Sequence, residues 1–417
     1  MTTDTIASGR LARGGEVQAI GLVSAAHFIS HFHIFVLPPL FPFLKEHFGA
    51  GFVELGLALT IGSLTSVAAQ MPMGYLSDRF GPRRLLIAGL IIGGVALASI
   101  GFVDSYAWLL VAAGLLGVAQ AVYHPADYAI LSARIAPYRI GRAFSVHTFA
   151  GMFGSAIAPA TMLVLNTTMG LRAALVAAGA IGPLVAILLM FARGLDSELR
   201  ATKPAEARAT DADRRRARVL TPAILGLTAF FALLSLSTTG ISNFSVVALM
   251  SAYAVPFSAA NLALTAFLTA SAFGVLGGGF VADMTRRHGD VAAIGFALNA
   301  LIILLVGTVG GAPAMLITAM GVAGFLSGMI MPSRDMLVRA AAPPGAVGRT
   351  FGIVTTGFSV GGTIGPMLFG WIMDCGAPRW VFGASVIFML LTVVLALAGD
   401  RPLRRRRAAI APAQSTS

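Results

Sequence analysis

The chain has 417 residues, of which 57% are hydrophobic and 11% charged, with a mean hydropathy of +0.85. A water-soluble protein needs a far more polar surface, so this composition excludes a soluble globule. The balance of charge is basic, with 29 Lys and Arg against 17 Asp and Glu. These residues lie in short islands between apolar runs, which indicates membrane topology and argues against a nucleic-acid partner.

Twelve membrane-spanning helices are predicted from apolar runs of about 20 residues, the length that crosses the hydrocarbon core of a bilayer. The predicted ranges are 18–40, 52–73, 84–103, 106–132, 143–165, 171–192, 220–247, 257–281, 291–309, 312–338, 350–373 and 379–399. The first run is too long for a signal-peptide core, so it is interpreted as an uncleaved anchor.

These spans divide the chain into two bundles of six helices. The predicted parts are a cytoplasmic segment 1–17, an N-terminal bundle 18–192, a cytoplasmic linker 193–219, a C-terminal bundle 220–399 and a basic cytoplasmic tail 400–417. Cys375 is the only cysteine of the sequence, so neither an intrachain disulfide nor a thiol-based metal site is expected.

The distribution of basic residues predicts the orientation in the membrane. Lys45, Arg172 and Arg379 fall on one side and Arg334 within a span, which leaves 25 of the 29 basic residues on the other side. Because basic residues favour the cytoplasmic side, both termini are expected in the cytoplasm. The chain is therefore predicted to be a multi-pass protein of a bacterial inner membrane.

The two bundles repeat each other in sequence. The segment Leu57–Thr60 reads LALT and recurs as Leu262–Thr265, while Gly154 recurs as Gly361, at a nearly constant offset of about half the chain. Parallel duplication of six helices is typical of transporters whose halves rock about a site near the middle of the bilayer.

One loop carries the motif of a known family. Residues 74–84 read GYLSDRFGPRR and match the pattern GxxxD(R/K)xGx(R/K)(R/K). Through this motif, the twelve spans and the repeat, the chain resembles the major facilitator superfamily. The resemblance implies an all-α membrane fold of two pseudo-symmetric six-helix bundles. It also implies transport of a small organic solute by alternating access.

The same resemblance implies a cytoplasmic gate built on the motif and on its weaker second copy. The expected gate residues are Gly74, Asp78, Arg79, Gly81, Arg83, Arg84, Arg142, Gly279, Asp283 and Arg349. In the family fold Asp78 faces the start of helix eleven near Arg349, whose partial positive charge attracts a carboxylate. Asp283 faces Arg142 in the same way. The alternative is that these charges only enforce topology.

Three further stretches are similar to the fosmidomycin-resistance-like branch of the superfamily. They are Ser30–Phe32 through Leu37–Pro42, Tyr123–Asp127 and Gly154–Pro159. That branch contains proton-driven drug exporters. The stretch Leu109–Gly114 departs from the antiporter pattern, because it lacks the arginine that proton antiporters commonly carry early in helix four.

Polar side chains inside the spans are the candidates for the transport path, since they are costly in lipid and normally face a partner or water. The candidates are Ser24, His27, His31, Gln120, His124, Asp127, Ser235, Thr238, Thr239, Ser242, Ser327, Arg334 and Asp335. They lie mainly on helices one, four, seven and ten, which line the path in the family fold.

Histidines and one acid are the expected carriers of a coupled proton. His27, His31 or His124 can change charge near neutral pH, and Asp127 could do so if it is buried. The alternative is that the histidines only hydrogen-bond neighbouring helices, which is the expected role of His33. The HxxxH spacing of His27 and His31 suits a metal pair, but no acid or cysteine lies nearby in sequence, so no metal site is predicted.

The repeat places Asp127 opposite Arg334, which predicts an ion pair between the halves that opens and closes during transport. The alternative is a permanent pair of Arg334 with Asp335, or with lipid phosphate.

The main functional hypothesis is proton-coupled efflux of a drug or metabolite by antiport, as in drug resistance. The first alternative is proton-coupled uptake of an organic anion such as a carboxylate. A non-transporting membrane sensor or a membrane-embedded enzyme is the alternative of another class, although no HExxH or nucleophile–base spacing is present. The expected partners are a small-molecule solute, protons and the lipid bilayer, with no cofactor, and the protein is expected to be a monomer.

Overall fold

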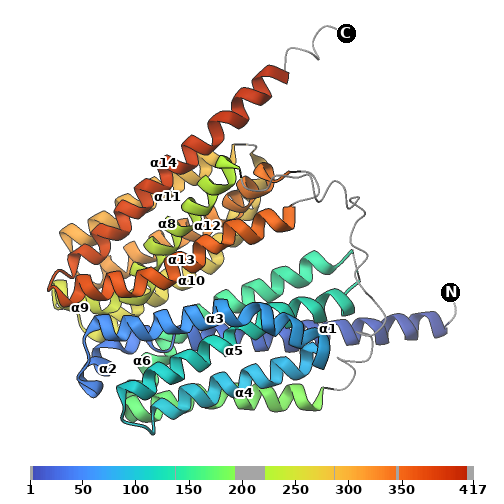
Figure 1. Cartoon of the computed structure of the whole chain (residues 1–417), viewed down its shortest axis with the longest axis horizontal. Helices are drawn as coiled ribbons and strands as arrows, with labels where there is room; N and C mark the ends of the chain where they lie inside the picture. The colour runs from blue at the N-terminus through green and yellow to red at the C-terminus, as the bar shows by residue number, and fades with distance from the viewer. Residues whose placement is uncertain (1–2, 137, 193–220, 286, 344–346, 411–417) are drawn as a thin grey trace. The chain divides into compact units, whose positions relative to one another are not determined.

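The computed structural model describes residues 3–136, 138–192, 221–285, 287–343 and 347–410 (Figure 1). Every regular element in these ranges is helical. The elements are α1 (Thr3–Ile34), η1 (Pro38–Leu40), α2 (Phe41–Phe48), α3 (Phe52–Phe80), α4 (Pro82–Ile100), α5 (Tyr106–Arg134), α6 (Ile140–Phe191), α8 (Pro222–Thr239), η2 (Gly240–Phe244), α9 (Ser245–Tyr253), α10 (Phe257–Met284), α11 (His288–Val309), α12 (Pro313–Ala341), α13 (Val347–Asp374) and α14 (Arg379–Ile410). The predicted linker 193–219 lies outside the described residues.

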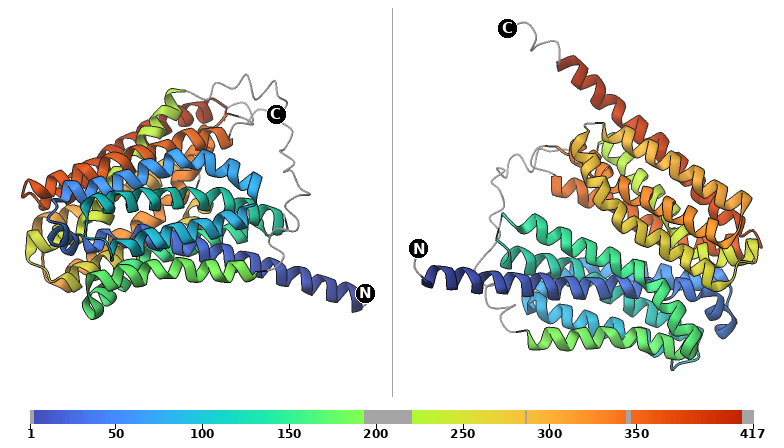
Figure 2. Two further views of the ribbon diagram at one scale, coloured as in Figure 1. Left: turned by 60° about the horizontal axis from the view of Figure 1, so that its bottom comes forward. Right: turned by 180° about the vertical axis from the view of Figure 1, so that it is seen from behind.

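The number of spans agrees with the prediction once α6 is counted as two. Eleven helical stretches of the described chain are long and apolar enough to cross a membrane. One of them, α6, contains Gly170 with φ 79° and ψ 169°, a conformation that only glycine adopts without strain. There α6 turns back on itself, from a teal limb to a green limb (Figure 2). The all-α fold with twelve transmembrane helices is thereby confirmed.

Several predicted boundaries differ from the structure, and three of them are instructive. The first helix, predicted to reach residue 40, ends at Ile34, shortly before Pro38 and Pro39, whose missing amide hydrogens disfavour a continuing helix. The seventh span, predicted to end at residue 247, continues through η2, a π-helical turn, to the end of α9. The last helix, α14, runs beyond the predicted end at residue 399.

The chain forms two compact units, Met1–Glu206 and Ala207–Ser417. In the first unit α1 packs on α6, α3 on α5, and α4 on both α5 and α6. In the second unit α8 packs on α13, α10 on α12, and α11 on both α12 and α14. The pairs correspond helix by helix, so the repeated sequence is also a repeated packing arrangement.

An apolar core holds the helices of the first unit that carry the polar candidates. Val23 and Ala26 of α1 pack in one cluster with Leu90 of α4 and with Ala126 and Ile130 of α5. These residues are 0–2% exposed. Ala26 and Ala126 directly precede His27 and Asp127 in the sequence. The packing of this core therefore brings the two polar side chains to the same level in the bundle.

Candidate functional site

Five ionisable side chains from three helices meet inside the first unit. They are His27 and His31 of α1, His124 and Asp127 of α5, and His147 of α6, which we call the histidine–aspartate cluster. The ring centroid of His27 lies 4.6 Å from that of His31, 5.3 Å from that of His124 and 3.8 Å from that of His147. His27 is therefore the centre of the group of rings.

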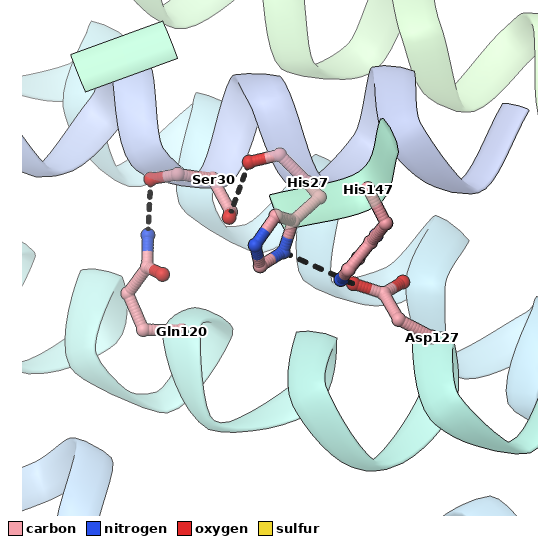
Figure 3. A network of polar contacts seen from close by, with 5 residues as sticks. All are labelled: His27, Ser30, Gln120, Asp127 and His147. Carbon is pink, nitrogen blue, oxygen red and sulfur yellow. Dashed lines mark hydrogen bonds and ion pairs between the residues drawn. The ribbon is translucent and has the colours of Figure 1, made fainter. Parts of the chain in front are cut away.

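Asp127 lies at the buried end of this cluster. Its Oδ2 atom is 3.2 Å from Nδ1 of His27 and 3.6 Å from Nε2 of His147 (Figure 3). The exposed fractions are 0% for Asp127, 1% for His147 and 4% for His27. Both imidazoles thus approach one carboxylate oxygen in a place closed to solvent.

Several polar atoms of these three residues lack a hydrogen-bond partner in the described part of the chain. They are both carboxylate oxygens of Asp127, Nδ1 of His27 and both ring nitrogens of His147. A buried polar atom left unpaired costs about 1–3 kcal/mol, and an ionised one more. The arrangement is therefore costly unless a cation, such as a proton, is taken up between the groups.

The other end of the cluster is more open. His124 is exposed, its neighbour Tyr128 is 47% exposed, and His31 is half-buried with Nδ1 at 3.2 Å from Oγ of Ser155. Since His124 and Asp127 are three residues apart on one helix, they share a face. The cluster therefore extends from an exposed histidine to a buried acid.

Hydrogen bonds to the backbone tie α5 to α1 beside the cluster. The side-chain amide of Gln120 donates to the carbonyl oxygen of Ser30 at 2.6 Å, and Oγ of Ser30 donates to the carbonyl oxygen of His27 at 2.8 Å (Figure 3). Ser24 is buried one turn away. His33 lies apart, with Nε2 at 3.2 Å from the carbonyl oxygen of Ala178, as expected for a structural residue.

His147 was missed by the sequence analysis, because its place beside α1 follows from helix packing. It precedes Gly154 by two helical turns, and Gly154 belongs to the internal repeat and faces the backbone of Phe28 on α1. Residues seven apart share a helix face. The position of Gly154 therefore indicates that His147 also faces α1.

The prediction of no metal site rests on distance along the sequence, whereas folding can bring distant ligands together. The acid that lies beside His27 is Asp127, about 100 residues later in the chain, and the second imidazole is His147 instead of His31. His27, Asp127 and His147 offer three ligand atoms within 4.8 Å of one another.

Two of the polar candidates of α8 form hydrogen bonds to backbone carbonyl oxygens. Oγ of Ser235 donates to the carbonyl oxygen of Phe358 at 3.0 Å, and Oγ1 of Thr238 donates to that of Leu234 at 2.9 Å. Thr239 and Ser242 are buried at the π-helical turn, and Ser327 of α12 is half-buried. Ser235, which bonds to the backbone of α13, therefore has a role in helix packing.

Arg334 lies against two aromatic rings in the second unit. Its guanidinium carbon is 4.9 Å from the ring centroid of Phe231 and 5.3 Å from that of Phe358, and its Nε donates to Oδ1 of Asp335 at 2.9 Å. Arg334 is 7% exposed. Among the described residues, the alternative pairing of Arg334 with Asp335 is thus present, while the pair between Asp127 and Arg334 stays a prediction.

The residues of the gate motif lie at helix ends. Gly81, with φ 91°, ends α3, and Asp78 is exposed in the last turn. Arg79, Arg84, Arg142 and Asp283 are also exposed, Gly74 and Gly279 have open space beside them, and the side chain of Arg349 lies outside the described residues. The gating role of these residues stays a prediction.

Arg83 has a structural contact within the first unit. Its Nε donates to the carbonyl oxygen of Leu189 at 2.9 Å, and its Nη2 to that of Met190 at 2.7 Å. These are among the last carbonyls of α6, where a cation interacts favourably with the helix dipole. One arginine of the motif therefore holds the start of α4 against the end of α6.

We expect Arg83→Gln to lower the melting temperature of the purified protein, because the shorter neutral side chain cannot cap α6. The loss corresponds to about 1 kcal/mol of unfolding free energy. Thermal unfolding in detergent measures it, with the exposed neighbour Arg84→Gln as the control. Equal melting temperatures for the two variants would contradict the capping role.

Known proteins resemble all or part of the chain. The fosmidomycin resistance protein of Escherichia coli (strain K12) is 25% identical over 384 residues, which cover 89% of this chain and 90% of that protein. A probable sulfoacetate transporter of Cupriavidus necator is 28% identical over 163 residues, which cover 39% of this chain and 38% of that protein.

The fold also matches a solved structure. A bacterial homologue of the human lysosomal transporter Spinster, in an inward-facing and occupied conformation, aligns with a TM-score of 0.76 at 16% identity, over 93% of this chain and 97% of that one. The sequence model described as Major Facilitator Superfamily matches residues 23–255 and 227–416. With its twelve spans and duplicated packing, the chain belongs to the Major Facilitator Superfamily.

Proposed function

We propose that this protein is a secondary active transporter that exports a small organic solute, a drug or metabolite, in exchange for protons. It would act in a bacterial inner membrane with both termini in the cytoplasm. The observation that carries the proposal is the histidine–aspartate cluster, in which an acid without a well-aligned hydrogen bond lies beside two stacked imidazoles. Membrane proteins keep such groups mainly where they bind or move ions.

The cluster has the parts that coupling requires. His124 offers an exposed imidazole, His27 lies between it and Asp127, and Asp127 is the negative group that a proton neutralises. Taking up a proton removes the cost of a buried unpaired charge, and losing it restores that cost. Protonation would thus bias the unit between two conformations, which is what alternating access needs.

Transport by proteoliposomes tests the proposal. The purified protein is reconstituted and given fosmidomycin or sulfoacetate, the compounds named for two relatives, with and without an imposed pH gradient. We expect the gradient to drive accumulation of at least one compound, and an ionophore that dissipates the gradient to abolish it. Accumulation that is equal with and without the gradient would contradict proton coupling. A lack of any movement across a broad solute panel would favour the sensor or enzyme alternative.

Uptake of an organic anion is the second candidate function, and Arg334 favours it. A guanidinium held against two aromatic rings presents donors in a fixed position, which suits a carboxylate or sulfonate. The partly matching relative named as a probable sulfoacetate transporter supports the same class of solute.

A thermal-shift measurement separates an anion-binding Arg334 from a structural one. We expect sulfoacetate to raise the melting temperature of the wild type, and Arg334→Gln to remove this increase, because the amide cannot supply the positive charge. The matched control is Arg379→Gln, since Arg379 is also stacked on an aromatic ring, 5.2 Å from Tyr253. An increase that persists in Arg334→Gln would exclude this role for Arg334.

A further inference from the structure

We propose that His27, Asp127 and His147 form a binding site for a divalent transition-metal ion of the Zn²⁺ and Co²⁺ class. The site goes beyond the proposed transport function, because binding requires only these three side chains and no movement of solute.

The spacing of the three side chains fits a tetrahedral metal ion. Bond lengths of about 2.0–2.1 Å to histidine nitrogen and carboxylate oxygen place neighbouring ligand atoms about 3.3 Å apart at the corners of a tetrahedron. Oδ2 of Asp127 lies 3.2 Å from Nδ1 of His27 and 3.6 Å from Nε2 of His147. Both distances are close to a tetrahedral edge, and all three ligand atoms lie within 4.8 Å of one another.

The ligand atoms are also those that lack a hydrogen bond within the described chain. Nδ1 of His27, Nε2 of His147 and both oxygens of Asp127 belong to this group. All three residues are buried, so water cannot readily supply the missing hydrogen bonds. A metal ion would accept the lone pairs of the two nitrogens and neutralise the carboxylate, which removes the cost of burying these atoms unpaired.

The chemistry of the three ligands selects the class of metal. Imidazole nitrogen suits zinc and cobalt, whereas magnesium and calcium prefer shells made of oxygen atoms. Two histidines and one acid occupy three of the four tetrahedral positions and leave one for water or another ligand. A site with one open position exchanges metal more readily than a closed structural site, so the ion should bind reversibly.

The three ligands come from rigid elements, which lowers the cost of assembling the site. They project from α1, α5 and α6, and the rings of His27 and His147 are stacked with an angle of 30° between their planes. The apolar core around Val23, Ala126 and Ile130 holds α1 and α5 together on either side of the cluster. Little side-chain freedom is therefore lost when the metal binds.

Cobalt titration of the full-length protein, purified in detergent with a histidine-free tag, tests the site. Tetrahedral Co²⁺ has strong visible ligand-field absorption that the hydrated octahedral ion lacks. We expect this absorption to saturate at one ion per chain and to disappear when Zn²⁺ is added, because zinc binds the same ligands more tightly. Wild-type protein that shows no saturable absorption would overturn the proposal without any variant.

Two variants and a control assign the absorption to these residues. His147→Gln and Asp127→Asn each replace a ligand by an amide of similar shape, and each should weaken Co²⁺ binding by about 100-fold or more, since loss of outer-shell groups alone costs about 10- to 100-fold. His33→Gln changes a buried histidine of α1 outside the site and should bind as the wild type does. Unchanged binding in both ligand variants, with all proteins eluting as folded species, would place the metal elsewhere and overturn the proposal.

The same titration is independent of the proposed transport function. Saturable Co²⁺ binding together with gradient-independent transport would retain the metal site and reject proton coupling. Gradient-driven transport by a protein that binds no Co²⁺ would retain proton coupling and reject the metal site.

Discussion

Asp127→Asn is expected to reduce strongly the accumulation of solute driven by a pH gradient, while exchange of solute across the membrane without a gradient continues. The amide has nearly the shape of the carboxylate, so the packing around His27 and His147 is retained. It has no negative charge for a cation to neutralise, and the free-energy difference that couples the cation to the conformation is lost. The driven accumulation should fall by about 10- to 100-fold, which corresponds to a typical coupling energy.

Asp104→Asn is the matched control for this measurement. Asp104 is 55% exposed and pairs with His47 and Arg172, away from the histidine–aspartate cluster. An exposed ion pair contributes little, so this variant should accumulate solute as the wild type does. If Asp127→Asn accumulated solute at the wild-type level under the same gradient, Asp127 would have no part in coupling.

Gly328→Ala is expected to destabilise the second unit strongly, although it adds a single methyl group. Gly324 and Gly328 of α12 form a GxxxG pattern where this helix crosses α10. A Cβ atom at position 328 would collide with the carbonyl group of Ser271 on α10, and its distance from the Cα of Ser271 would be 3.0 Å. Since the obstacle is backbone, the helices must separate. We expect a loss of about 1–3 kcal/mol or more, measured as a lower melting temperature in detergent.

Gly321→Ala provides the comparison on the same helix. A Cβ atom there would meet only the Cβ of Ala266, at 3.8 Å, which is an ordinary contact. Alanine has the higher helix propensity, by up to about 1 kcal/mol, so this variant should be as stable as the wild type or more stable. Two variants with the same melting temperature would show that α10 and α12 do not cross as closely as described.

The sequence predicted the candidate site in part, and the gap has a physical cause. His27, His31, His124 and Asp127 were identified because ionisable groups within apolar spans are rare and costly. His147 was not identified, since it lies only seven residues into α6 and close to Arg139 and Arg142, where a polar residue is unremarkable. Its importance depends on α6 packing against α1, which a list of spans does not contain.

Arg334 illustrates the same limit in the second unit. The repeat placed it opposite Asp127, a pairing that follows from symmetry alone. In the structure its guanidinium is held by Asp335 and by the rings of Phe231 and Phe358. Phe231 and Phe358 belong to α8 and α13, so no pattern near Arg334 in the sequence predicts that it contacts these rings.

Span number, duplication and family membership can be read from the amino-acid sequence alone. A membrane span is recognised from about 20 consecutive apolar residues, which cross the hydrocarbon core at a rise of 1.5 Å per residue. The motif at residues 74–84 is also one short continuous stretch. The meeting of His27, Asp127 and His147 depends on helix packing instead. These residues are separated by long stretches of chain, and only the close approach of α1, α5 and α6 brings their polar atoms within 4.8 Å of one another.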